Sequence, residues 1–147
     1  LGNFRGAKRR LEFKGKLGGA DVYDDYAHHP TEIAATLDAA RQMGYDRVIC
    51  VYQPHTYSRT KGLFDEFAAA LGKADLPILC DIYAARETDT LGVSSELLAK
   101  ATRGAVYMES FDRIADYLRE HARAGDLILT MGAGDIAKLA GLLLGGK

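Results

Sequence analysis

The sequence has few of the features that mark several classes of protein. It contains two cysteines in 147 residues. Cys50 and Cys80 lie within or at the end of apolar stretches of strand type, where we expect buried, reduced thiols rather than a disulfide framework. The longest apolar runs are far too short to span a bilayer, and no signal peptide is visible. We therefore expect a cytoplasmic location and no membrane partner.

The sequence also has little net charge. A formal charge of -1 argues against a dedicated nucleic-acid binder. The charge is uneven, however, because residues 1–19 hold only Glu12 against the basic side chains Arg5, Lys8, Arg9, Arg10, Lys14 and Lys16. This start could face a phosphate or could simply be solvated.

Repeats, low-complexity segments and a second domain are not visible, and the length suits one domain, residues 1–147. The chain starts at Leu1 without a methionine, so we expect it to be a piece of a longer protein.

The order of elements predicts the fold class. Residues 10–16 and 21–26 flank Gly18-Gly19 and predict a hairpin. Apolar strand-like runs then alternate with helical patterns: strands at 47–52, 77–81, 105–108 and 126–131, and helices at 30–43, about 58–71, 94–101, 110–124 and about 134–144.

This alternation predicts a Rossmann-like, three-layer α/β domain. Its sheet should have about six mostly parallel strands, with an antiparallel edge strand from the hairpin. In such sheets ligands bind at the carboxyl ends of the strands. Four polar segments follow strands and should meet there: DDYAHHP (24–30), QPHTYSRT (53–60), YAARETDT (83–90) and GAGD (132–135).

DDYAHHP allows three interpretations. Adjacent histidines rarely point the same way, and neither HExxH nor a spaced Cys/His pattern is present, so we expect no metal site. A structural role explains Pro30, His29 at a helix start, and one acid satisfying turn amides. It does not explain Tyr26 and His28, which leaves proton chemistry as the third interpretation.

QPHTYSRT places Arg59 in the first turn of a predicted helix. A cation there opposes the helix dipole. An anionic ligand would compensate, because backbone amides and an arginine fork both suit a carboxylate or phosphate. The competing interpretation is a cap at Ser58 with a solvated Arg59.

GAGD mimics a dinucleotide fingerprint, but no strand with a ribose-binding acid follows it. A glycine turn onto the last helix is the better interpretation. GxxxxGK[ST] is also missing, so this chain cannot hold a triphosphate by itself.

Taken in order, RRLEFKG, VYDDYAHHPTEI, QPHTYSRTKGLFDEFAAAL, DIYAARE, GVSSELLA and DLILTMGAGDI resemble the C-terminal domain of the Mur ligase family over essentially the whole chain. DDYAHHPTE is shared with the branch that recycles murein peptides, whereas QPHTYSRT favours the branch that adds L-alanine. The resemblance implies an ATP-dependent amide ligase of peptidoglycan biosynthesis. It would join L-alanine to UDP-N-acetylmuramic acid through an acyl phosphate, with ATP and Mg²⁺ held mainly by a P-loop domain outside this chain.

The resemblance also implies roles for individual residues. Arg10 and Asp25 match the ATP side, and Tyr26, His28, His55 and Arg59 match the L-alanine side. Arg59 would bind the substrate carboxylate, and we hypothesise that His28 takes the amine proton. Some relatives have arginine where this chain has Thr56, so the group that replaces it is left open. The fragment alone should be inactive. The alternatives are a murein tripeptide recycling ligase and a stand-alone anion or small-molecule binding module.

Overall fold

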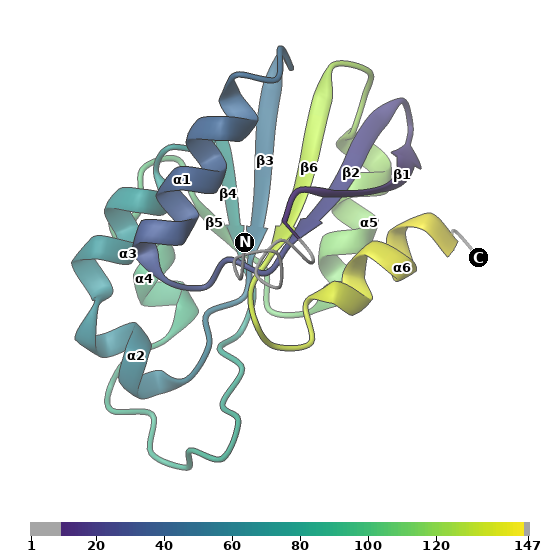
Figure 1. Cartoon of the computed structure of the whole chain (residues 1–147). Helices are drawn as coiled ribbons and strands as arrows, with labels where there is room; N and C mark the ends of the chain where they lie inside the picture. Colours follow the sequence, from purple (N-terminus) through teal and green to yellow (C-terminus); the bar gives the residue numbers. More distant parts are fainter. Residues whose placement is uncertain (1–9, 146–147) are drawn as a thin grey trace, which may run out of the picture.

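The computed structural model describes residues 10–145. Six strands form one sheet in the order β1-β2-β6-β3-β4-β5 (Figure 1). In sequence order the strands are β1 Glu12–Leu17, β2 Ala20–Asp25, β3 Arg47–Tyr52, β4 Leu76–Leu79, β5 Val106–Tyr107 and β6 Asp126–Met131. The helices are α1 Pro30–Arg41, α2 Tyr57–Gly62, α3 Phe64–Leu71, α4 Ser95–Ala101, α5 Phe111–His121 and α6 Ala137–Gly145.

The sheet has the predicted mixed topology. β1 and β2 pair antiparallel at one edge, and all other neighbours are parallel. Gly18 and Gly19 turn the hairpin with φ of 58° and 89°, a left-handed backbone that glycine adopts readily. The predicted α/β class, the strand number and the antiparallel edge are therefore confirmed.

Two apolar clusters fill the spaces between the layers. Along β3, Val48, Cys50 and Tyr52 face α1, α3 and α4, while Ile49 and Val51 face α5 and α6. This alternation, typical of a strand buried on both faces, gives the three layers seen in Figure 1. Both cysteines are free and buried, as expected, and burial raises the pKa of the Cys80 thiol to about 12.

One predicted helix is divided. The pattern from about 58 to 71 predicts a single helix, but the structure has α2 and α3 separated at Leu63, whose φ is -123°. The break follows Gly62, a residue that stabilises helices poorly. The short α2 is therefore a separate helix from α3 and lies near the carboxyl ends of the strands (Figure 1). Within residues 10–145, no helix is both long and apolar enough to cross a membrane.

Candidate functional site

The carboxyl ends of β2 and β3 carry the two loops with the richest chemistry. These strands flank β6 in the sheet, so their loops meet across the end of β6. The Tyr52 hydroxyl, at the end of β3, donates to the His28 carbonyl at 3.1 Å and joins the two loops. The predicted meeting of DDYAHHP and QPHTYSRT therefore occurs.

The end of DDYAHHP starts α1, as predicted. The His29 side chain accepts a hydrogen bond from the Thr31 amide at 3.3 Å, and Pro30 occupies the first helical position. Glu32 completes a capping box by accepting from the amides of His28 and His29, both at 3.2 Å. Burial opposes ionisation of Glu32, but these amides keep its pKa below the ordinary value.

Asp25 is the acid that satisfies turn amides. One carboxylate oxygen accepts from the Ala27 amide at 2.8 Å, and the other accepts from the Leu11 amide at 3.0 Å and the Thr36 hydroxyl at 3.4 Å. The residue is 1% exposed, and burial raises its carboxyl pKa. All three contacts are internal, so in this conformation Asp25 does not face the crevice.

Tyr26, His28 and His55 form a row of rings. The Tyr26 and His28 ring centroids are 5.2 Å apart, and those of His28 and His55 are 6.5 Å apart. His28 Nδ1 lies 3.1 Å from the Tyr26 carbonyl and 3.6 Å from Glu32. Three of the four residues predicted for the amino-acid side are thus close together.

His55 packs against a neighbouring ring and has one unpaired ring nitrogen. Its ring stacks on Tyr83 at 5.4 Å between centroids. Its Nδ1 is the one buried side-chain nitrogen or oxygen without a hydrogen-bond partner in the part of the chain that the structure describes. Burial lowers its pKa, and the nearby Arg59 and His28 lower it further. Both effects disfavour the protonated form of the ring.

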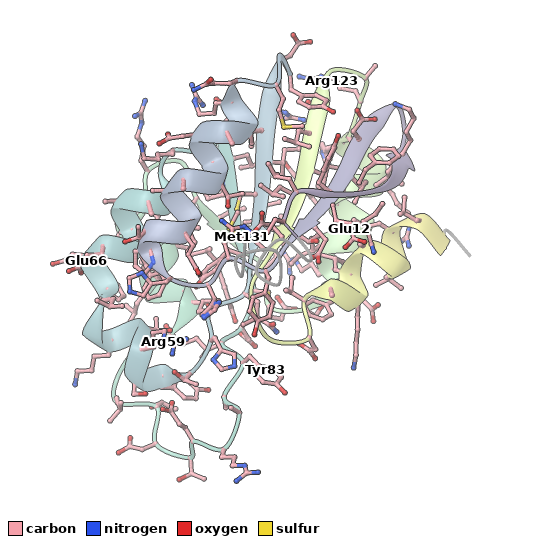
Figure 2. All side chains as sticks on the ribbon, in the orientation of Figure 1. Glu12, Arg59, Glu66, Tyr83, Arg123 and Met131 are labelled. Carbon is pink, nitrogen blue, oxygen red and sulfur yellow. The ribbon has the colours of Figure 1, made fainter. Side chains whose placement is uncertain are left out.

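Tyr83 opens YAARETDT, one of the four segments expected at this rim, but its pairing with His55 was not predicted. Its amide donates to the Pro54 carbonyl and its carbonyl accepts from the Thr56 amide, both at 2.8 Å. These bonds pair His55 with Tyr83 beyond the ends of β3 and β4. The position of DIYAARE directly after a strand was the available signal. Figure 2 shows Tyr83 and Arg59 on the same rim.

Arg59 lies on α2 with its side chain exposed. Among residues 10–145 no hydrogen bond or ion pair engages its guanidinium. The expected anion at this helix terminus is internal, however, because Glu87 accepts from the amides of Tyr57 at 2.5 Å and Ser58 at 3.1 Å, and from the Ser58 hydroxyl. Ser58 is therefore not the cap. Thr56 is, accepting from the Arg59 amide at 3.3 Å.

The GAGD segment is a structural turn. The Gln53 side chain donates to Asp135 at 2.7 Å and accepts from the Ile136 amide at 3.1 Å. A Cβ on Gly134 would come within 2.5 Å of Gln53 Oε1 and 2.7 Å of Tyr83 Cγ. Gly134 thus allows the turn to pack closely against Gln53 and Tyr83.

Arg10 is exposed and lies close enough to favour the charged forms of Asp25 and Glu32, although burial still raises the pKa of Asp25. The two residues predicted for ATP are therefore neighbours. The rest of the basic start, Arg5, Lys8 and Arg9, lies outside the described residues. Across the described part of the chain, no group of three or more His, Cys, Asp or Glu side chains is arranged to hold a metal ion.

Together these features define a class: a Rossmann-like domain whose strand-end loops bring a guanidinium, two imidazoles and a phenol onto one rim. The family follows from comparison with known proteins. The family described as Mur ligase, glutamate ligase domain matches residues 9–134. The chain belongs to the Mur ligase family, as its C-terminal domain.

Curated relatives carry the name UDP-N-acetylmuramate–L-alanine ligase. The protein from Lachnospira eligens is 53% identical over 98% of this chain, and that from Clostridium beijerinckii is 51% identical over 92%. The chain spans about a third of their length, 32% and 30% respectively.

Solved structures agree on the fold. A murein peptide ligase from Psychrobacter arcticus has a TM-score of 0.74 at 27% identity, covering 94% of this chain and 29% of that one. A domain from a Haemophilus ducreyi protein, titled as a ligase for L-alanyl-γ-D-glutamyl-meso-diaminopimelate, has a TM-score of 0.68 at 32% identity. It covers 93% of this chain and 98% of that one, so a similar domain has been solved as a separate unit.

Proposed function

We propose that this chain is the C-terminal domain of an ATP-dependent ligase that joins L-alanine to UDP-N-acetylmuramic acid in peptidoglycan biosynthesis. The observation that carries the proposal is the unengaged guanidinium of Arg59 on the same rim as Tyr26, His28 and His55. Identity of 53% to a UDP-N-acetylmuramate–L-alanine ligase supports it.

The proposed chemistry follows from the substrate. L-Alanine has a small methyl group, so its selection rests on its charged ends and on exclusion of bulk. Arg59 would bind the carboxylate through two parallel hydrogen bonds. The amine must lose a proton before attacking an acyl phosphate, and His28 is our candidate for accepting that proton. His55, whose ring centroid lies 6.5 Å from that of His28, would line the same site.

ATP would lie against the opposite end of DDYAHHP. Arg10 suits this role, because it is an exposed cation beside the loop. Asp25 suits it only after a rearrangement, since its oxygens are already bonded to Leu11, Ala27 and Thr36. A ribose hydroxyl could replace the Leu11 amide if the segment entering β1 moved. ATP supplies the phosphoryl group that activates the carboxylate.

The rest of the machinery is assigned to the longer protein. As the resemblance to Mur ligases implies, Mg²⁺ would be held mainly by the P-loop domain. UDP-N-acetylmuramic acid and the P-loop would likewise belong to other domains, and the isolated chain would be inactive. Closure of this domain over them would keep water from the acyl phosphate. We propose a cytoplasmic enzyme, where ATP and UDP-sugars are available.

A chimera tests this function. The 147-residue chain would replace the C-terminal third of the Lachnospira eligens relative, and phosphate release would be followed as L-alanine is varied. We expect Arg59→Ala to raise the KM for L-alanine by about 10- to 100-fold, the worth of a charge-assisted hydrogen bond. Lys61→Ala, which removes a cation from the same helix, is the control and should leave KM unchanged. Equal KM values for the two variants would refute the assignment.

A second candidate has its own support. Two of the similar solved structures are titled as ligases of murein peptides, at 27% and 32% identity. A tripeptide recycling ligase would share the DDYAHHP loop but accept a longer amine donor. The chimera distinguishes the two functions: phosphate release with L-alanine supports the first, and release with the tripeptide supports the second.

A further inference from the structure

The function proposed above leaves one motif without a role. In DIYAARE, Tyr83 stacks on His55, but Glu87 has no place in that chemistry. Its carboxylate nevertheless makes three hydrogen bonds to a helix 30 residues earlier in the chain, through the amides of Tyr57 and Ser58 and the Ser58 hydroxyl. A half-buried acid with these three hydrogen bonds has a role beyond that of a solvated surface residue.

Glu87 completes the first turn of α2. Thr56 Oγ1 accepts from the Arg59 amide, and the Thr56 carbonyl accepts from the Thr60 amide at 3.3 Å. The two remaining amides of the turn, those of Tyr57 and Ser58, are the ones that Glu87 takes. With six residues, α2 is too short to be stable by itself, so its direction depends on these contacts.

The backbone on both sides of this contact is strained. Thr56 has φ of 67° and Ala85 has φ of 59°, the left-handed region that non-glycine residues rarely adopt. Ala85 lies within the turn closed by the bond from the Glu87 amide to the Ala84 carbonyl at 3.0 Å. Such strain persists only where surrounding contacts hold it, and it concentrates at functional sites.

We propose that Glu87 is a positioning residue for the amino-acid site. Its carboxylate fixes the first turn of α2, and thereby the directions in which Arg59 and His55 meet the substrate. The inference rests on the proposed function. Glu87 does not touch the substrate. It acts through α2, which carries Arg59, and through the Tyr83 segment, whose two backbone bonds hold the His55 loop.

The first test needs no activity. In the 147-residue chain, amide hydrogen exchange at Tyr57 and Ser58 should become at least about ten-fold faster in Glu87→Ala, because both amides lose their acceptor. Exchange at Val51, in the middle of β3, reports general unfolding and should not change. Glu120→Ala, which removes an exposed acid from α5, is the matched control. Unchanged exchange at Tyr57 and Ser58 would overturn the inference.

The second test uses the chimeric ligase. Glu87→Ala should raise the KM for L-alanine by about ten-fold and leave the KM values for ATP and the UDP-sugar unchanged, because only the amino-acid site is displaced. Glu87→Gln keeps an oxygen acceptor for both amides and should restore most of the wild-type KM. A merely structural role would change all three KM values together, and that result would overturn the inference. If L-alanine did not support phosphate release by the wild-type chimera, the proposed function would be overturned. The hydrogen-exchange test of Glu87 would still stand.

Discussion

At the scale of single residues, the strand-end loops combine side chains that make internal hydrogen bonds with side chains that do not. Asp25 is the last residue of β2 and His29 lies in the loop that follows, and both make internal hydrogen bonds. Arg59 and His55 carry polar atoms without internal partners in the described chain. Residue type alone does not tell the two sets apart. Their hydrogen-bond partners do, and several of these partners lie in distant parts of the sequence.

Asp25 gives the first prediction. Asp25→Ala leaves the Leu11 and Ala27 amides and the Thr36 hydroxyl without their acceptor, so we expect the free energy of unfolding to fall by about 1–3 kcal/mol. Urea denaturation of the 147-residue chain measures this. Asp116→Ala is the control, because that side chain is 82% exposed. A loss no larger than the control's would show that Asp25 is not a structural acceptor.

His55 gives a prediction about pH. Its folded-state pKa lies below the ordinary value of 6.5, because burial and the neighbouring Arg59 disfavour the charged ring. The unfolded chain therefore binds the proton more readily between the two pKa values. This contribution to the free energy of unfolding is complete above pH 6.5. It is lost as the pH falls from 6.5 through the lower, folded-state pKa.

An NMR titration of the His55 ring should find its midpoint below 6.5. His55→Gln should flatten the stability change between about pH 7.5 and 5.5, because the variant has no ring to titrate. A midpoint above 6.5 would contradict the packing described for this ring.

At the scale of elements, local pattern predicted most of the fold. Alternation predicted the hairpin and strands. The helix expected at 94–101 begins at Ser95, and Ser94 caps it by accepting from the Leu97 amide at 3.1 Å. The pattern from 58 to 71 missed the break at Leu63, because the apolar spacing continues across it. It also missed the anion at α2, because Glu87 lies 30 residues further along the chain. Tertiary contacts of this kind leave no local signal.

The turn from β6 to α6 gives an element-scale prediction. Gly134→Ala would place a Cβ 2.5 Å from Gln53 Oε1 and 2.7 Å from Tyr83 Cγ, so we expect destabilisation by about 1–3 kcal/mol. Gly141→Ala is the matched control within α6. Its Cβ meets nothing within 4 Å, and alanine stabilises a helix by about 0.5–1 kcal/mol relative to glycine. The midpoint of thermal unfolding should fall in Gly134→Ala and rise in Gly141→Ala. An unchanged midpoint in Gly134→Ala would contradict the close packing.

At the scale of the whole molecule, strand order creates the site. β6, the last strand in sequence, lies between β2 and β3, and the loops after those two strands meet across its end. Rossmann-like alternation predicted that polar loops share one rim. It did not predict which loops become neighbours, since many strand orders fit the same alternation. The resemblance to Mur ligases, rather than the pattern, supplied the expected partnership of His28, His55 and Arg59.

The central claim is that this domain selects L-alanine. The most direct measurement is the ratio of kcat/KM for L-alanine to that for L-alanyl-γ-D-glutamyl-meso-diaminopimelate in the chimera with the Lachnospira eligens relative. A site built around the carboxylate of a small amino acid should favour L-alanine by about 100-fold or more. A ratio near one, or one favouring the tripeptide, would contradict it.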